Sequence, residues 1–402
     1  MLTTSILLAA SLLGLRPMDA GQTEPVAPSA SAVAPWREEL VERAWRAATA
    51  MPLVPHVKNR SRAQESVVDA CLELGLAGKA EKLALEIVNW RSAAALSSVA
   101  LHHARGGRAE EARRVAHATE ALITKNTAEA AQEWQDERVR ARLAATYVWI
   151  GDKADAARLA PGIGESEAGA VQSAVAAKTS PEDADARFAA IDKAVTAGGF
   201  ENVRNALQAC AELHARCWDD VERRERAERT IREGWSLLPL RVRIDLLASL
   251  AKTRIEHGAE ALALVTEIRT LIDGAQWLPE DRAPLRAQVA TLRYQAGERQ
   301  EARRELDAAL AGYTKDRTEI VDIYRAGALR PVAEAYATMG DPDEARRVFA
   351  RALEEGTLNP NSRPRADDLV ATCLAMAKAG VEPDATLRVR LEQIAGAFGD
   401  PW

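Results

Sequence analysis

The sequence predicts an all-α protein that is built by stacking antiparallel helix pairs, and three observations support this. Alanine-rich amphipathic stretches follow one another along most of the chain, and alanine is the best helix former. Short breaks containing glycine, aspartate or proline separate these stretches at recurring places. No stretch alternates apolar and polar residues with a period of two, which is the signature of a half-buried strand.

The length of the chain favours growth by repetition. The chain has 402 residues, whereas a single compact core stops growing at roughly 250–300 residues. Hydrophobic residues make up 47% and charged residues 28% of the sequence, a balance that indicates a folded chain. Aromatic residues make up only 4%. This shortage of aromatic strand formers argues against a sheet protein.

The breaks share one arrangement: the end of a helix, a glycine turn, and a second helix that opens with acidic residues and alanine. Glycine tolerates the left-handed conformation needed just past a helix end, and an acidic residue suits the next N-terminus through the helix dipole. Five segments show it: ALHHARGGRAEEARRVA (100–116), AATYVWIGDKADAARLA (144–160), SLAKTRIEHGAEALALV (249–265), ATLRYQAGERQEARREL (290–306) and AEAYATMGDPDEARRVF (333–349).

The clearest copy of the arrangement is the last. Its first helix carries large apolar, small and tyrosine residues on one face, and its second helix carries alanine and phenylalanine at i, i+4 and i+7. The copy at 286–310 departs from this pattern, with Arg293 where tyrosine is expected. The face of the last copy consists of Leu329, Val332, Ala333 and Tyr336, then Ala345, Phe349 and Ala352 after Gly340.

These residue types and spacings resemble the tetratricopeptide (TPR) repeat. The resemblance implies an α-α superhelix, a TPR-like solenoid of antiparallel helix pairs, in which the first helix of each pair lines a peptide-binding groove. The function it implies is a non-catalytic scaffold that binds a protein or peptide. HEAT-like and other helical repeats stay open as alternatives. The candidate groove residues in the last copies are Arg293, Tyr294, Arg325, Arg330, Glu334 and Ala337.

The spacing of the repeats is irregular. A strict TPR array repeats every 34 residues, but the interval between Ala156 and Ala261 must hide at least one further pair. We place helices at 182–197 and 200–217, paired with each other, and an extra helix at 219–234. A last pair at 364–379 and 384–398 is expected to cap the stack. The alanines that mark the second helices are Ala80, Ala112, Ala156, Ala261, Ala302 and Ala345.

The N-terminus resembles an export signal. Leu7 to Leu15 form an apolar run that is too short for a permanent membrane anchor, and Ala20 offers a small residue for cleavage. No basic residue precedes the run, so a misassigned start is the rival interpretation. We therefore predict a signal peptide at 1–20, a Pro/Ala-rich linker at 21–35, and a periplasmic or secreted helical repeat domain at 36–398.

The regular spacing of the repeats breaks at 182–234, so an interruption of the repeat domain there stays open. This least regular segment is where a specific function could have been built. After signal cleavage no stable transmembrane anchor is expected.

No sequence motif indicates catalysis or a cofactor. The net charge of −6 and the pI of about 5.7 argue against nucleic acid as a partner. We therefore predict no enzyme activity and no cofactor. The enzyme class that stays open is the α/α-toroid polysaccharide hydrolase or lyase, although no two of the 59 carboxylates are singled out.

Two further groups of residues have competing interpretations. Cys210, His214 and Cys217 share one helical face, where they could hold zinc or copper, but buried core packing is the preferred reading. The tryptophans are likewise expected to fill the core, with a ligand-facing role as the alternative. They are Trp45, Trp90, Trp134, Trp149, Trp218, Trp235 and Trp277.

Overall fold

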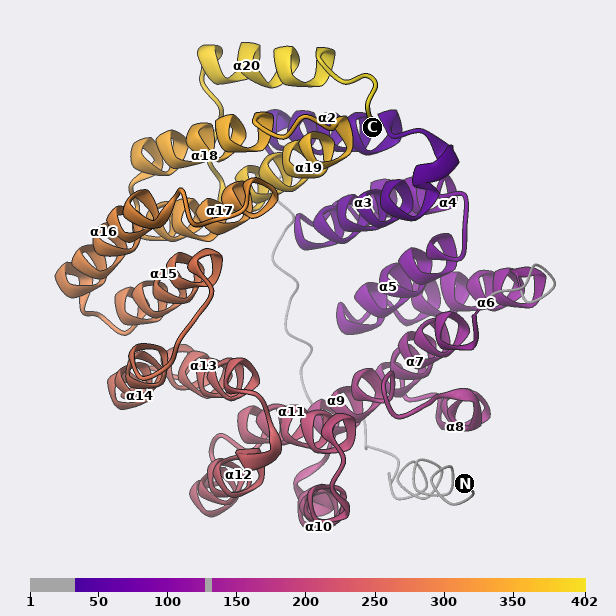
Figure 1. Cartoon of the computed structure of the whole chain (residues 1–402). Coiled ribbons are helices and arrows are strands. Elements are labelled where there is room, and N and C mark those ends of the chain that lie inside the picture. Colours follow the sequence, from indigo (N-terminus) through magenta and orange to yellow (C-terminus); the bar gives the residue numbers. More distant parts are fainter. Residues whose placement is uncertain (1–32, 127–131) are drawn as a thin grey trace. The chain divides into compact units, whose positions relative to one another are not determined.

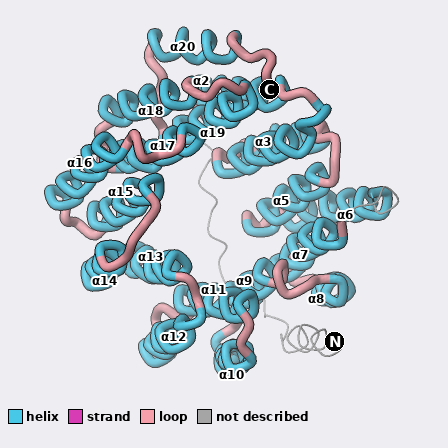
Figure 2. The backbone as a smooth tube through the Cα atoms, viewed as in Figure 1, coloured by secondary structure: helices cyan, strands magenta, loops and turns pink. Residues whose placement is uncertain are grey.

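The computed structural model describes residues 33–126 and 132–402. Within these ranges all regular structure is helical, with nineteen α-helices, three short 3-10 turns and no strand (Figure 2). The all-α prediction is confirmed. The predicted signal peptide at 1–20 and nearly all of the predicted linker at 21–35 lie outside the described residues.

The predicted turns and helix faces are confirmed residue by residue. Gly151 and Gly340 end helices with φ of 78° and 77°, conformations that a side chain disfavours. Asp152 and Asp341 then cap the next helices by accepting hydrogen bonds from backbone N–H groups three residues on. All six marker alanines are buried, as is the whole predicted face of the last copy.

The chain divides into two compact units, which are described separately. The first unit contains Trp90–Thr253 and the second contains Ala30–Asn89 and Arg254–Trp402. The helices of the first unit are α5 (Arg91–Arg105), α6 (Ala109–Asn126), α7 (Glu133–Trp149), α8 (Lys153–Leu159), α9 (Gly169–Ala177), α10 (Ala184–Ala197), α11 (Phe200–Arg216), α12 (Val221–Gly234) and α13 (Leu240–Glu256), whose last turn crosses the boundary.

In the first unit, α5, α7, α9 and α11 pack side by side in this order. We call these four helices the A layer of the first unit, because they are the first helices of successive pairs. Helix α6 pairs with α5, α8 with α7, and α12 with α11. The irregular segment thus continues the stack.

The helices expected at 182–197, 200–217 and 219–234 are present as α10, α11 and α12, and α10 packs on α11 as predicted. Helix α12, expected as an extra helix, also packs on α11, which in turn packs on α9. Pro161 lies in a 3-10 turn directly after the seven-residue α8. The chain then forms the short α9, which was not predicted.

The second unit contains both ends of the described chain. Its regular pairs are α15 with α16 and α17 with α18, and α3 also pairs with α4. Helices α15, α17, α19 and α3 form its A layer. The helices are α2 (Pro35–Ala50), α3 (Leu53–Glu73), α4 (Ala77–Leu85), α14 (Leu262–Asp273), α15 (Pro279–Gln295), α16 (Arg299–Asp316), α17 (Asp322–Thr338), α18 (Pro342–Thr357), α19 (Ser362–Ala379) and α20 (Ala385–Gly396).

The predicted capping pair at 364–379 and 384–398 is wrong in its partners, although both helices exist as α19 and α20. Helix α19 takes α2, from the other end of the chain, as its main partner (Figure 1). The reason is that α19 is apolar on more than one side and must be covered on each. Cys373 and Met376 of α19 are buried, and so are Leu40 and Val41 of α2.

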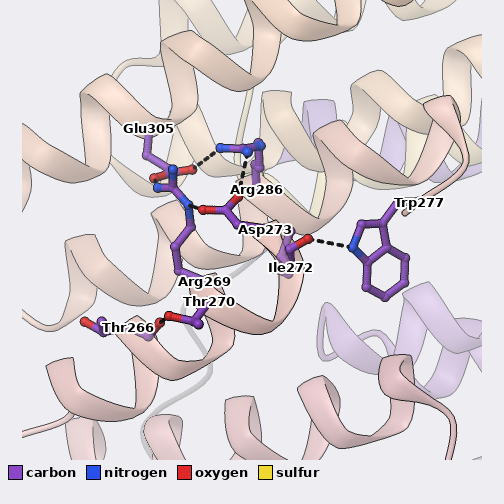
Figure 3. A network of polar contacts seen from close by, with 8 residues as sticks. All are labelled: Thr266, Arg269, Thr270, Ile272, Asp273, Trp277, Arg286 and Glu305. Atoms are coloured by element: carbon purple, nitrogen blue, oxygen red, sulfur yellow. Dashed lines mark hydrogen bonds and ion pairs between the residues drawn. The ribbon is translucent and has the colours of Figure 1, made fainter. Parts of the chain in front are cut away.

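A network of charges ties α14 to the α15/α16 pair in the second unit (Figure 3). Glu305 of α16 is 7% exposed and lies between two arginines. Its Oε1 accepts a hydrogen bond from Nη1 of Arg286 at 3.1 Å, and Arg269 of α14 pairs with its Oε2. Arg286 also bonds Asp273 at 2.8 Å. The buried carboxylate is therefore paired from two helices, as a buried charge requires.

Candidate binding pocket in the first unit

A pocket of about 340 Å³ opens on the A layer of the first unit. All four helices of this layer contribute to its lining, together with the loop that precedes α9. In a protein of net charge −6, the charged side chains of the lining are mostly basic. They are Arg105, Arg138, Arg142, Arg204, Glu167 and Glu212.

Small residues on α9 leave the space between the long side chains. Gly169, Ala170 and Ser173 line the pocket from this helix. A Cβ on Gly169 would lie 2.7 Å from Oδ1 of Asn205, so only glycine admits the buried asparagine at this place. Asn205 in turn donates a hydrogen bond of 2.8 Å to the carbonyl of Glu165, which holds the loop before α9.

Three of the four arginines are held in place by neighbours. Arg138 forms a two-pronged ion pair with Glu167, at 2.9 and 3.1 Å. Arg142 donates to the carbonyl oxygen of Ala94 at 3.0 Å, and Arg204 pairs with Glu201 at 2.6 Å. These contacts fix the walls of the pocket.

Arg105, at the end of α5, differs from the other three arginines. Its guanidinium lies 6.0 Å from the ring centroid of Trp149 and forms no ion pair with any carboxylate of the described residues. Lys178 approaches the same ring, at 5.6 Å. An exposed guanidinium that carries five N–H donors and lacks an anionic partner is available to a ligand.

Glu212 of α11 lines the same pocket. Partial removal from water raises the pKa of its carboxyl group, and the positive charge of Arg105 opposes that rise. No hydrogen bond to the Glu212 carboxylate is formed within the part of the chain that the structure describes. The pocket therefore offers an anion-binding group and a cation-binding group together.

The six groove residues predicted from the sequence all lie in the second unit, on α15 and α17. Arg293, in the expected tyrosine position, pairs with Glu298 at 3.5 Å. Arg325 donates to the carbonyl of Ile320 at 2.9 Å, and Arg330 bonds Asp368 of α19 at 2.9 Å. These three arginines therefore take part in contacts within the repeat stack.

The other three predicted groove residues lie on the same two helices. Tyr294 lies under Arg299, with 5.6 Å between the guanidinium and the ring centroid. Desolvation raises the pKa of Glu334, and Ala337 is partly exposed. Glu334 lies one helical turn after Arg330 on α17.

The prediction that tryptophan fills the core is confirmed only in part: eight of the nine tryptophans are half-buried, and Trp134 is exposed. The largest fully buried side chains are instead Tyr147, Tyr336, Phe188 and Phe349. Six of the tryptophans lie under a neighbouring cation, an arrangement typical of exposed indoles. They are Trp36, Trp90, Trp134, Trp149, Trp218 and Trp235.

Besides Trp149, two partly exposed indoles lie near the pocket. Trp90 and Trp134 meet edge to face, with 5.1 Å between their ring centroids. Arg138, which lines the pocket, stacks on Trp134. Sequence reasoning missed the pocket itself, although one signal was present: arginine recurs at positions 138 and 142 of one helix, one turn apart, on the face that also bears Ala141 and Ala145.

Cys210, His214 and Cys217 are buried, as core packing predicts. The Cys210 thiol lies 3.5 Å from the carbonyl oxygen of Ala227, and Nε2 of His214 lies 3.1 Å from Glu228 of α12. Within residues 33–126 and 132–402 no three His, Cys, Asp or Glu side chains are placed to hold a metal ion. The zinc or copper hypothesis therefore lacks a ligand set there.

Comparisons with known proteins assign no family to this chain. No protein-family model matches the chain, and no curated protein is similar to it in sequence. One similar solved structure is described as a "Circular tandem repeat protein with novel repeat topology and enhanced subunit contact surfaces". It has 17% sequence identity and a TM-score of 0.24, and the match covers 90% of this chain and 94% of that one. None of the described helices is long and apolar enough to cross a membrane.

Proposed function

We propose that this protein is a divergent TPR-like scaffold without catalytic activity, and that an acidic stretch of a protein or peptide partner docks in the pocket of the first unit. The supporting observation is the unpaired guanidinium of Arg105 in a pocket lined by four arginines. The pocket lies on the first helices of successive pairs, the helices that bind peptides in TPR proteins. The six predicted groove residues of the second unit remain candidates for additional contacts.

The chemistry of the pocket favours carboxylate groups. The planar guanidinium presents its N–H donors in a fork that matches the two oxygens of a carboxylate. Arg138 and Arg142 are already oriented by Glu167 and by the carbonyl of Ala94, so little side-chain freedom is lost on binding. The volume lies near the lower end of the roughly 300–1,000 Å³ range of small-ligand pockets. It suits an extended segment of a few residues.

We also propose that the protein works in the periplasm or outside the cell. The apolar run at the N-terminus supports this. Expression of the full chain in a bacterial host, with N-terminal sequencing of the product in each cell fraction, tests it. Cleavage near Ala20 and recovery in the periplasm or medium are expected. An uncleaved product in the cytoplasm contradicts export.

Selection from a phage-displayed library of random dodecapeptides tests the docking proposal. The purified protein is immobilised, and acidic sequences are expected to be enriched. Isothermal titration calorimetry then measures an enriched peptide against Arg105→Ala. Loss of a charge-assisted contact predicts a fall in affinity of about tenfold or more. Arg347→Ala is the matched control, since its side chain on α18 is 74% exposed and lies in the other unit. Enrichment without acidic residues, or equal affinities of the two variants, contradicts the proposal.

The α/α-toroid polysaccharide hydrolase or lyase is the second candidate, and one observation favours it. Trp134 and Trp149 are partly exposed near Arg138, Arg105 and Glu212, and flat indoles are suitable platforms for sugar rings. Incubation with a uronate-containing polysaccharide, followed by reducing-end and ultraviolet assays of the products, tests this candidate. Turnover that disappears in Glu212→Gln establishes an enzyme, and its absence favours the scaffold.

A further inference from the structure

Opposite charges from the first and last helices of the A layer meet at one pocket. Arg105 comes from α5 and Glu212 from α11, and both line the pocket of the first unit. They are close enough for the charge of Arg105 to act on the Glu212 carboxyl group. Even so, they form no ion pair with each other or with another described residue.

The residues around each group explain why the two do not pair. The Arg105 guanidinium lies by the ring of Trp149, near the end of α7. Glu212 lies two helical turns after Asn205 on α11, and Asn205 is fixed to the loop before α9. Gln208, on the turn between them, also lines the pocket and has no hydrogen bond within the described chain. Arg105, Gln208 and Glu212 thus all line the pocket without a hydrogen bond or ion pair to another described residue.

We infer that the pocket binds a peptide segment that carries both an acidic and a basic side chain, with the acidic group toward Arg105 and the basic group toward Glu212. This inference rests on the proposed function and adds a second requirement to the partner. A ligand with an acidic group alone would leave the Glu212 carboxylate partly desolvated without a partner, which is unfavourable. A basic group supplies the missing charge.

The size of the pocket limits the form of this segment. An α-helix with side chains is about 10–12 Å across, so an extended segment fits a pocket of about 340 Å³ better than a helix does. An extended chain places alternate side chains on the same side, about 6.6 Å apart. The acidic and basic residues are therefore expected at a short, constant spacing along the segment.

The dodecapeptide library, selected in parallel on the wild-type protein and on Glu212→Gln, tests the inference. Glutamine keeps the shape of glutamate and removes its charge. The wild-type protein is expected to enrich peptides with an acidic and a basic residue at constant spacing. Glu212→Gln is expected to keep the acidic preference and to lose the basic one. Glu212→Lys is expected to replace the basic preference with an acidic one.

Calorimetry with one enriched peptide and its lysine-to-norleucine analogue measures how much the basic side chain adds to the binding affinity. The analogue is expected to bind the wild-type protein about tenfold more weakly, as for other close charge pairs, and to bind Glu212→Gln as well as the parent peptide does. Circular dichroism melting of each variant confirms that it is folded. Glu222→Gln is the matched control, because it makes the same change at an exposed position of α12 that does not line the pocket, and it should not change the lysine preference.

The outcomes separate the two proposals. Acidic peptides without any basic preference, enriched equally on both proteins, overturn this inference and leave the proposed function standing. Failure to enrich acidic peptides at all overturns the proposed function and the inference with it. A basic preference that persists in Glu212→Gln and in Glu212→Lys assigns the basic group to another carboxylate and also overturns the inference.

Discussion

The two units are built from the same kind of helix pair but differ in how regular the pairs are. In the second unit, helices α15 to α18 have 17, 18, 17 and 16 residues, and their facing sides are filled by buried side chains. In the first unit, α8 and α9 have 7 and 9 residues. The short α9 lines the pocket together with its neighbours in the A layer. A solenoid can therefore open a pocket by shortening a helix at one place in the stack.

Both units use the same kind of hydrogen bond, from a tyrosine to a carboxylate, between one helix pair and the next. Tyr147 donates a hydrogen bond of 2.7 Å to Glu120 in the first unit, and Tyr336 donates one of 2.8 Å to Asp307 in the second. Each carboxylate also accepts from an arginine, Arg158 or Arg303. The units therefore share the contact between successive pairs and differ in the lengths of the helices.

The second difference between the units is that the second one joins helices from opposite ends of the described chain. In the second unit, α2 supplies the partner of α19 from more than 300 residues away in the sequence. Glu39 of α2 also pairs with Arg388 of α20, and Arg43 pairs with Glu392 at 2.7 Å. The helix pairs of the first unit all form between neighbours in the sequence.

The largest expected change in stability tests the packing of α2 on α19. Val41 of α2 is fully buried, so Val41→Asp places a carboxylate on the buried face of α2, whose main partner is α19. We expect the free energy of unfolding to fall by about 4 kcal/mol or more, measured by urea denaturation with circular dichroism. Val389→Asp is the control, because Val389 on α20 is 58% exposed. A Val41→Asp variant as stable as this control would show that α2 does not cover α19 in solution.

An intermediate effect tests the shared contact between pairs. Tyr147→Phe and Tyr336→Phe each remove one hydrogen bond to a carboxylate, which predicts a loss of about 1.5–3 kcal/mol in either unit. Denaturation curves of the two variants should be shifted by similar amounts. Tyr324→Phe is the control, since this tyrosine is 48% exposed. A loss confined to one of the two variants would mean that the units do not use a common contact.

The smallest expected change in stability compares one glycine in a regular helix of the second unit with one in the shortened α9 of the first unit. Gly312 lies within α16, where a Cβ meets no atom within 4 Å, so Gly312→Ala should stabilise the second unit by about 0.5–1 kcal/mol. Gly169→Ala should instead destabilise the first unit by about 1 kcal/mol or more, because its Cβ collides with Asn205. Thermal unfolding measures both changes. Equal stabilisation by both substitutions would show that the contact of Gly169 with Asn205 is not tight.

Much of the local structure could be predicted from the sequence. The breaks at Gly151 and Gly340, the acidic caps that follow them, and the buried faces of the helices depend on residues only a few positions apart. The helices at 182–234 were also predicted at nearly their observed bounds. The short α9 was missed because Pro161 and the glycines around it resemble an ordinary loop.

The candidate site was less predictable. The sequence-based candidates lie on α15 and α17, the most regular pairs, because regularity is what a repeat pattern reveals. Arg105 and Glu212 are 107 positions apart, and neither belongs to a recognisable motif. Only packing of α5, α7, α9 and α11 into one layer brings them to the same pocket.

The sequence by itself determined the all-helical class, the positions of most helices and the glycine turns, because backbone hydrogen bonds and dihedral preferences act between near neighbours. The tertiary structure alone decided that α2 covers α19, that most of the tryptophans are half-buried at the edge of the core, and that Arg105 and Glu212 share a pocket. These features depend on which apolar faces fit together at close packing density. That fit is a property of distant segments together, and no local pattern encodes it.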